Sequence, residues 1–174
     1  MIRLACRRLA EETGHQGAWK LLEELYREET GEDLPPVVRT ERGKPYFPDS
    51  PYYFSLSHTP RHAVCVLSDR NVGVDAEETD RRVNPGLAGK ILSVPERERV
   101  ERSDDPRLAL LRLWVLKEAA AKLTGEGLRG YPNQTNRTGS ARKFSLSLQK
   151  LRHQTVRRPG SILPPVYWAP ASRC

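Results

Sequence analysis

The sequence predicts one domain that combines helices with antiparallel strands. Its 174 residues suit a single domain or two small halves packed together. Apolar residues recur at helical spacing in two long segments, and three short β-prone runs are separated by short turns. Hydrophobic residues make up 37% and charged residues 29% of the chain, which is not the composition of a disordered protein.

The first half is predicted to contain a strand, a helix and a group of strands. A strand over residues 2–9 is followed by an amphipathic helix over residues 15–30, which a glycine ends. The apolar positions of this helix are Ala18, Leu21, Leu22, Leu25 and Tyr26. Residues 33–51 are rich in Pro and Gly and are predicted to form a loop. The β-prone runs cover residues 52–57, 63–67 and 71–77. The short separators between them favour an antiparallel arrangement.

The second half is predicted to be mainly helical. A short helix is expected over residues 84–92, and Ser93 is placed to cap the next one. The clearest helix covers residues 107–124, where almost every residue favours helix. Asp105 is its expected N-cap and Gly125 its expected stop.

The net charge of +7 is confined to the C-terminal part of the chain. Residues 1–128 hold 20 Lys and Arg against 22 Asp and Glu, a net charge of −2. Residues 129–174 hold 9 Lys and Arg and no acidic residue, with no sustained period of either helix or strand. We therefore predict a domain over 1–128 and a basic, irregular or altered tail over 129–174. One hypothesis is that the sequence from about residue 136 onward is out of frame.

The compartment is predicted from the cysteines and the N-terminus. Cys6, Cys65 and Cys174 are odd in number and widely spaced, so three unpaired thiols in a cytoplasmic protein are expected. No apolar run approaches the ~20 residues of a membrane helix, and the first residues lack the apolar segment of a signal peptide. No association with a membrane is expected.

Two carboxylates follow each other on the third β-prone run. Because successive side chains of a strand point to opposite faces, Asp75 and Glu77 share one face, about 6.6 Å apart along the strand. Such a pair repels unless a cation lies between its members, and Mg²⁺ prefers oxygen ligands of this kind. The alternative is an ordinary solvated strand face.

The last helix carries a second group of charged residues. Trp114, Glu118 and Lys122 lie on one face at i, i+4 and i+8, whereas Lys117 is expected to be solvated. If this helix packs beside the Asp75 strand, Glu118 completes a three-carboxylate cluster and Lys122 is placed to meet an anion. The alternative is a surface ion pair worth a few tenths of a kcal/mol.

A third group combines Lys44-Pro45 with Ser57-His58. A lysine before a rigid proline, and a Ser-His pair where a strand turns, are plausible phosphate contacts. A polar turn is the alternative. A nucleophilic Ser57-His58 pair is disfavoured, because adjacent residues of an extended strand point apart.

These motifs occur in a specific order. They are GKP at 43–45, FSLSH at 54–58, VGVDAE at 72–77 and WVLKEAAAKLTGEGL at 114–128. In this order the chain resembles the 4′-phosphopantetheinyl transferases. It is more similar to their surfactin-synthetase-activating type than to the small acyl-carrier-synthase type, since GKP and SLSH precede the acidic strand. The resemblance covers residues 1–128.

The resemblance implies an α+β fold of two similar halves, about 1–70 and 71–128. Each half is a small antiparallel sheet packed on a helix, with the cofactor in the cleft between them. The C-terminal part of this chain is atypical or incomplete for the family, which continues here into further strands.

The implied activity is that of a holo-[acyl-carrier-protein] synthase. Such an enzyme transfers 4′-phosphopantetheine from coenzyme A to a serine of an acyl or peptidyl carrier protein and releases adenosine 3′,5′-bisphosphate. The reaction depends on Mg²⁺, with Mn²⁺ as an alternative. The carrier would serve fatty-acid, polyketide or nonribosomal peptide biosynthesis.

The resemblance also implies roles for individual residues. The metal ligands would be Asp75, Glu77 and Glu118. Glu118, or a water that it orients, would be the base for the serine hydroxyl, and Lys122 would meet the coenzyme A phosphates as a second catalytic residue. The other cofactor-binding residues would be Lys44 and Pro45 beside the adenine, and Ser57 and His58 at the 3′-phosphate.

Two other functions remain open from the sequence. One is a basic nucleic-acid-binding module built on the tail, which predicts salt-dependent binding that is lost on deleting 129–174. The other is an inactive binder of coenzyme A or carrier protein. We expect the transferase instead, acting as a monomer without nucleic acid.

Overall fold

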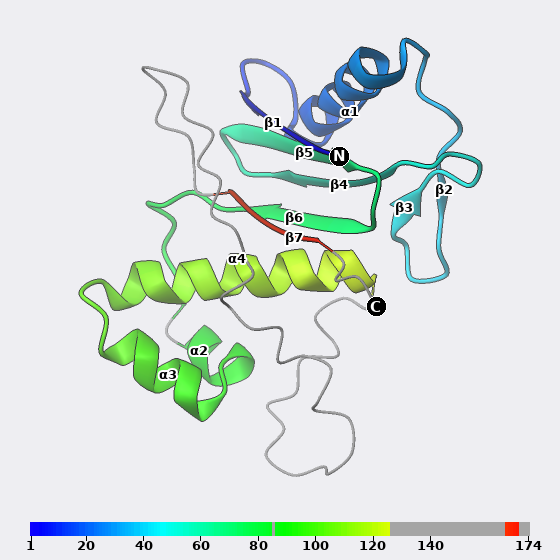
Figure 1. The fold of residues 1–174 in the computed structure, drawn as a ribbon. Coiled ribbons are helices and arrows are strands. Elements are labelled where there is room, and N and C mark those ends of the chain that lie inside the picture. The colour runs from blue at the N-terminus through cyan, green and yellow to red at the C-terminus, as the bar shows by residue number, and fades with distance from the viewer. Residues whose placement is uncertain (85, 126–165, 171–174) are drawn as a thin grey trace, which may run out of the picture.

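The computed structural model describes residues 1–84, 86–125 and 166–170, the last of these as backbone only (Figure 1). The strands are β1 (Ile2–Arg8), β2 (Val38–Arg39), β3 (Pro45–Tyr46), β4 (Tyr53–His58), β5 (His62–Ser68), β6 (Val72–Ala76) and β7 (Val166–Pro170). The helices are α1 (Gly14–Thr30), α2 (Gly86–Ile91), α3 (Val94–Glu101) and α4 (Pro106–Thr124). This mixture of helices and antiparallel sheet confirms the predicted α+β class.

Helix α1 covers the first sheet, whose antiparallel strands lie in the order β1-β5-β4 (Figure 1). Thr13 and Gln16 form a capping box at its start, and Gly31 ends it in the left-handed conformation with φ 76°. Its five predicted apolar positions are all buried and pack against side chains such as Phe54 and Leu67. The prediction of an amphipathic helix is therefore confirmed.

The segment predicted as a loop contains a short hairpin. Strands β2 and β3 pair Val38 with Tyr46 and Arg39 with Pro45. Gly43, with φ 85°, makes the tight turn between them. Two residues per strand are too few for a detectable alternation, which explains why the sequence did not predict this hairpin.

Strand β6 is the exception to the predicted antiparallel group. Strands β4 and β5 pair as expected, with His58 opposite Ala63, but β6 belongs to a second sheet with β7, where Ala76 faces Val166. The expectation of one three-stranded arrangement is therefore wrong for β6. The partner strand β7 lies within the predicted tail. The rest of that tail, including residues 126–128 of the last motif, is outside the described residues, and the boundary at 128 stays a prediction.

Helix α4 lies directly on β6 (Figure 1). As predicted, the Asp105 side chain caps the helix by accepting from the Leu108 N–H at 2.9 Å, and Gly125 ends it with φ 72°. The close contact depends on Gly73, because a Cβ there would stand 2.0 Å from the Ala119 carbonyl oxygen. The two elements that carry the predicted charged residues are thus in contact.

Helices α2 and α3 pack on the other side of α4. Their shared core consists of Leu92, Val100, Leu110 and Leu113. Ser93 occupies the predicted N-cap position of α3, where its N–H and its hydroxyl both donate to the Glu96 carboxylate. Glu96 also pairs with Lys117 at 2.9 Å, so the expectation of a solvated Lys117 is wrong: its ammonium ties α4 to α3.

Two further observations concern the whole described part. No helix in it is long and apolar enough to cross a membrane. Cys6 and Cys65 carry free thiols, as predicted, and Cys174 lies outside the described residues. Burial, with a smaller contribution from the charge of Glu78, raises the pKa of Cys6 to about 11.

Candidate functional site

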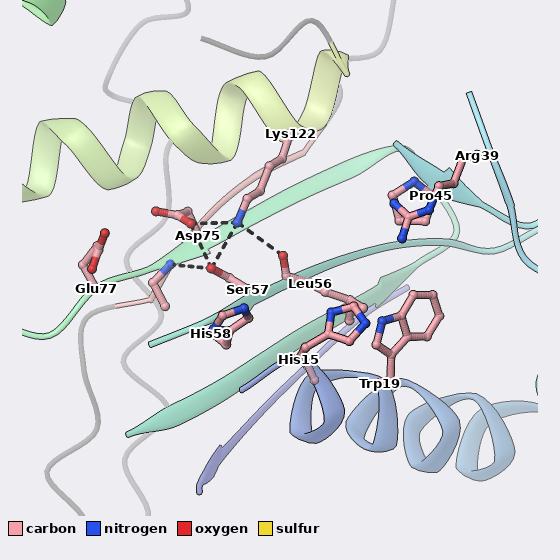
Figure 2. Close-up of a pocket in the computed structure, with 12 residues that line it drawn as sticks. His15, Trp19, Arg39, Pro45, Leu56, Ser57, His58, Asp75, Glu77 and Lys122 are labelled. Atoms are coloured by element: carbon pink, nitrogen blue, oxygen red, sulfur yellow. Dashed lines mark hydrogen bonds and ion pairs between the residues drawn. The ribbon is translucent and has the colours of Figure 1, made fainter. Parts of the chain in front are cut away.

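Lys122 connects three elements: α4, β6 and β4. Its ammonium reaches from α4 to the Asp75 carboxylate of β6 at 2.8 Å. It also donates to Ser57 Oγ at 3.1 Å and to the Leu56 carbonyl oxygen at 3.3 Å, both on β4 (Figure 2). The condition for a shared site, that the last helix packs beside the acidic strand, is therefore met.

Asp75 is a buried carboxylate whose charge is balanced by an ion pair with Lys122. Only 7% of the residue is exposed, and it accepts hydrogen bonds from Lys122 and from Ser57 Oγ, the latter at 2.8 Å. On the opposite face of the same strand, Val72 and Val74 are buried in the apolar core. The alternative of a solvated strand face is wrong, because α4 covers the side that carries Asp75.

Glu118 lies close enough to Asp75 for the two carboxylates to repel. Burial raises the pKa of Glu118, the charge of Asp75 raises it further, and Lys122 and Arg81 oppose the rise. A carboxylate in this environment is more basic than an exposed one, which favours its acceptance of a proton. The repulsion is also what a bound divalent cation would relieve.

Glu77 lines a cavity together with Asp75 but has a different partner. Its carboxylate forms an ion pair with Arg81, four residues further along the chain and outside any helix. Within the part of the chain that the structure describes, no three metal-ligating side chains are grouped closely enough to hold an ion. The donors that could take a divalent cation are therefore Asp75 and Glu118, joined by Glu77 once it is released from Arg81.

The predicted residues surround two neighbouring cavities. The first, of about 310 Å³, is lined by Pro45, Ser57, His58, Asp75, Glu77 and Lys122. The second, of about 280 Å³, is lined by Lys44 and Glu118 and shares Pro45, Leu56 and Lys122 with the first. The eight residues predicted to hold the metal or the cofactor thus line two cavities that share part of their lining.

Lys44 lines the second cavity while its ammonium is held by the protein. It donates to Asn71 Oδ1 at 2.6 Å and to the Leu123 carbonyl oxygen at 2.7 Å, and burial lowers its pKa. The lysine thereby satisfies a carbonyl in the last turn of α4, where a cation also complements the helix dipole. Lys44 fastens the β2–β3 hairpin to α4.

Several residues of the site carried no recognisable sequence signal. His15, Trp19 and Arg39 line the first cavity, and Figure 2 shows His15 and Trp19 facing it from α1, across from Lys122. The Trp19 ring packs edge-on against Phe54, with 5.9 Å between centroids. A residue on a helix beside its buried face looks the same in sequence whether it lines a core or a cavity.

A buried ionic cluster follows the acidic strand and was also not predicted. The Glu78 carboxylate accepts from Thr59 Oγ1, pairs with Arg61 at 2.9 Å and lies 2.9 Å from His62 Nδ1. Burial alone would raise the pKa of Glu78, but these hydrogen bonds outweigh it and lower the pKa to about 2. The cluster fixes the chain directly after Glu77.

A third cavity, of about 810 Å³, lies beyond this cluster. Its lining includes Leu9, Pro60, Arg61 and Arg81, and it shares His58 and Glu77 with the first cavity. The open region around the predicted residues therefore continues past the end of β4.

Comparison with known proteins supports the family resemblance. A family model described as the 4′-phosphopantetheinyl transferase superfamily matches residues 71–162. The 4′-phosphopantetheinyl transferase AcpT of Escherichia coli (strain K12) is 36% identical over 97 residues, which are 53% of this chain and 50% of that protein. The 4′-phosphopantetheinyl transferase Sfp of Bacillus subtilis (strain 168) is 31% identical over 91 residues, 51% of this chain and 40% of that protein.

A putative 4′-phosphopantetheinyl transferase of Haemophilus influenzae is 32% identical over 112 residues, 58% of this chain and 48% of that protein. The chain spans about half the length of the curated relatives it matches. The similarity to Sfp supports the resemblance to the surfactin-synthetase-activating type. Since the family model covers more than half of the sequence, the chain belongs to the 4′-phosphopantetheinyl transferase superfamily.

Proposed function

We propose that this protein transfers the 4′-phosphopantetheine group of coenzyme A to a serine of an acyl or peptidyl carrier protein. The observation that carries the proposal is that Lys122 pairs with Asp75 where α4 packs on β6, while Glu118 is near enough for the charge of Asp75 to raise its pKa; the three residues line two cavities that share Lys122. This arrangement combines a cation for phosphate groups with a carboxylate of raised pKa, and both are needed for phosphoryl transfer to a hydroxyl.

Lys122 is the proposed anchor for the pyrophosphate. Its side chain is about one-third exposed, and its ammonium holds Asp75 at the wall of the first cavity. His58 lies on the same wall and can donate a hydrogen bond to the 3′-phosphate. Lys44 and Pro45 border the region from the side of the β2–β3 hairpin, where the adenine is proposed to lie.

The carboxylates fit a hard divalent cation by their chemistry. Asp75 and Glu118 repel each other, and Glu77 lines the first cavity together with Asp75. Asp75 and Glu118 would hold Mg²⁺, or Mn²⁺ in its place, and Glu77 would join them once it is released from Arg81. When bound, the ion supplies positive charge to the pyrophosphate of coenzyme A.

Glu118 is the proposed base. It accepts the proton of the carrier serine hydroxyl, directly or through a water, while the serine oxygen forms a bond to the β-phosphorus of coenzyme A. The bond from that phosphorus to the bridging oxygen breaks, and adenosine 3′,5′-bisphosphate leaves. The raised pKa of Glu118 favours this proton transfer, and Lys122 stabilises the charge on the phosphate oxygens.

Mass spectrometry of an apo carrier protein tests the proposal. Incubation with this protein, coenzyme A and Mg²⁺ should add one phosphopantetheine group to the carrier, and Asp75→Ala and Glu118→Gln should suppress the addition. Two different apo carriers, one of fatty-acid and one of peptide synthesis, reveal the substrate class. Undiminished transfer by both variants would refute the assigned site, and no transfer to either carrier by the unmodified protein would contradict the proposed activity.

The compartment and the assembly are part of the same proposal. The free thiols of Cys6 and Cys65 fit a reducing compartment, and we propose that the protein acts in the cytoplasm. We propose that it acts as a monomer. Light scattering of the purified protein at working concentration gives the molar mass that checks this.

A further inference from the structure

Hydroxyl side chains occupy every second position at the end of β4 and just beyond it. Each meets a partner 19 residues further along the chain. Ser55 Oγ accepts from the Val74 N–H at 3.0 Å, Ser57 Oγ accepts from the Ala76 N–H at 3.3 Å, and Thr59 Oγ1 donates to the Glu78 carboxylate. The three pairs advance together, so β4 and β6 run side by side in the same direction.

These hydroxyls replace a backbone ladder. Strands β4 and β6 belong to different sheets, so they are not paired as neighbouring strands in the described residues. Val74 and Ala76 present their N–H groups to the same edge of β6, and both residues are buried. A buried N–H group without a partner costs about 1–3 kcal/mol. The serine oxygens avoid this cost by accepting hydrogen bonds from the two N–H groups.

We propose that Ser55, Ser57 and Thr59, here named the hydroxyl seam, are positioning residues for the acidic strand. The proposal rests on the proposed function, because Asp75 and Glu77 are the carboxylates that the seam would position. Ser55 holds the strand just before Asp75, and Thr59 holds it just after Glu77 through Glu78. Two fastenings that enclose a segment of five residues leave its side chains little freedom to shift.

Ser57 has a second role within the seam. Besides accepting from Ala76, its hydroxyl donates to Asp75 Oδ1 at 2.8 Å and receives a hydrogen bond from Lys122. Its oxygen therefore joins the strand backbone, the carboxylate and the ammonium. The hydrogen bond from Ser57 orients the Asp75 carboxylate, just as residues that hydrogen-bond to metal ligands fix the orientation of those ligands.

The Thr59 end of the seam is reinforced by charge. Glu78 also pairs with Arg61, in the turn between β4 and β5, and contacts His62, the first residue of β5. The carboxylate is buried, so this end of the seam is held by several partners. Ser55 is the simpler end, with a single hydrogen bond to test.

Amide hydrogen exchange by NMR tests the seam independently of any activity. Ser55→Ala should accelerate exchange at Val74, and Ser57→Ala should accelerate it at Ala76, each about tenfold. Ser68→Ala is the matched control: Ser68 is also a buried strand serine, bonded to the Met1 carbonyl and the Arg70 N–H, and it lies outside the seam. Unchanged exchange at Val74 in Ser55→Ala would overturn the seam.

Binding of Mn²⁺, followed by electron paramagnetic resonance, tests the positioning role. Ser55→Ala should weaken binding about tenfold although the Ser55 hydroxyl bonds to the Val74 N–H and to neither Asp75 nor Glu77, whereas Ser68→Ala should leave it unchanged. Thr59→Val should also weaken Mn²⁺ binding, whereas Thr59→Ser, which keeps the hydroxyl, should bind Mn²⁺ like the unmodified protein. If Ser55→Ala and Thr59→Val bind Mn²⁺ like the unmodified protein, the positioning role is wrong.

The two proposals fail in different ways. If the unmodified protein neither binds Mn²⁺ nor transfers phosphopantetheine, the proposed function fails, while the exchange data still report on the seam. If the unmodified protein does both and the seam variants match it, the positioning role alone is overturned.

Discussion

Gly73 allows α4 to lie on the acidic strand, and Gly73→Ala tests how much the site depends on that contact. An added Cβ would stand 2.0 Å from the Ala119 carbonyl oxygen and 2.5 Å from the Leu123 backbone nitrogen. Cβ atoms almost never approach other atoms closer than 3.0 Å, so the helix backbone must retreat by about 1 Å. Both clashing groups belong to backbone, which cannot rotate away as a side chain can.

Two consequences follow from this retreat. Overpacking of a core typically lowers the free energy of unfolding by about 1–3 kcal/mol. Lys122 precedes the clashing residue Leu123 and moves with it away from Asp75. A displacement of about 1 Å in a site can reduce a rate about 10²-fold, and we expect a loss of this size in phosphopantetheine transfer.

Guanidinium unfolding and the carrier-protein mass assay measure the two effects. Gly89→Ala is the control, because a Cβ on that α2 residue meets no atom within 4 Å. It should keep full transfer and gain up to about 1 kcal/mol of stability from its higher helix propensity. If Gly73→Ala keeps both the stability and the transfer rate of the unmodified protein, the close contact of α4 with β6 is refuted.

Three further predictions concern charges. Lys122→Met should weaken binding of adenosine 3′,5′-bisphosphate at least tenfold in calorimetry and lower stability by about 1–3 kcal/mol, because it leaves the buried Asp75 without its ion pair; equal affinity would contradict the anchor role. Burial favours a higher pKa for Glu96, but hydrogen bonds from Lys117 and Ser93 outweigh it and lower the pKa. The contribution of Glu96 to stability is therefore present above the ordinary carboxyl pKa and is lost as the pH falls through the lowered value. Glu96→Gln should therefore cost about 1–2 kcal/mol at pH 7 and less under acid conditions, measured by urea unfolding at both pH values. Mg²⁺ should raise the Tm of the unmodified protein and not that of Asp75→Asn in differential scanning fluorimetry, since only the former keeps the mutual repulsion that the ion relieves.

The elements set by local sequence were predictable. The caps at Asp105 and Gly125 are one-residue signals, and the apolar period of α1 extends over several turns. The alternation around Asp75 also predicted correctly which residues face the core. These properties depend on neighbours within a few positions in the chain, so they can be read from the sequence.

The contacts between distant segments were not predictable. Lys44 reaches the carbonyl of Leu123, and Lys117 pairs with Glu96, and in neither case does local sequence indicate the partner. The seam was visible only as a Ser-x-Ser-x-Thr alternation, which is equally typical of a solvated strand face. Pairing partners are decided by packing of the whole domain, and the sequence around each residue carries little information about it.

The pairing of β6 with β7 has a consequence for the order of folding. In this pair Ala76 faces Val166, 90 residues later, whereas the β4–β5 hairpin closes over a few residues. Closing a long loop costs more entropy, so the sheet of β1, β5 and β4 with its helix can form before β6 gains its outer neighbour. At the usual rates of synthesis those 90 residues take roughly 5–18 s, during which the edge of the acidic strand is open. During synthesis, the β7-facing edge of β6 is therefore the strand edge that waits longest for its partner among the described strands.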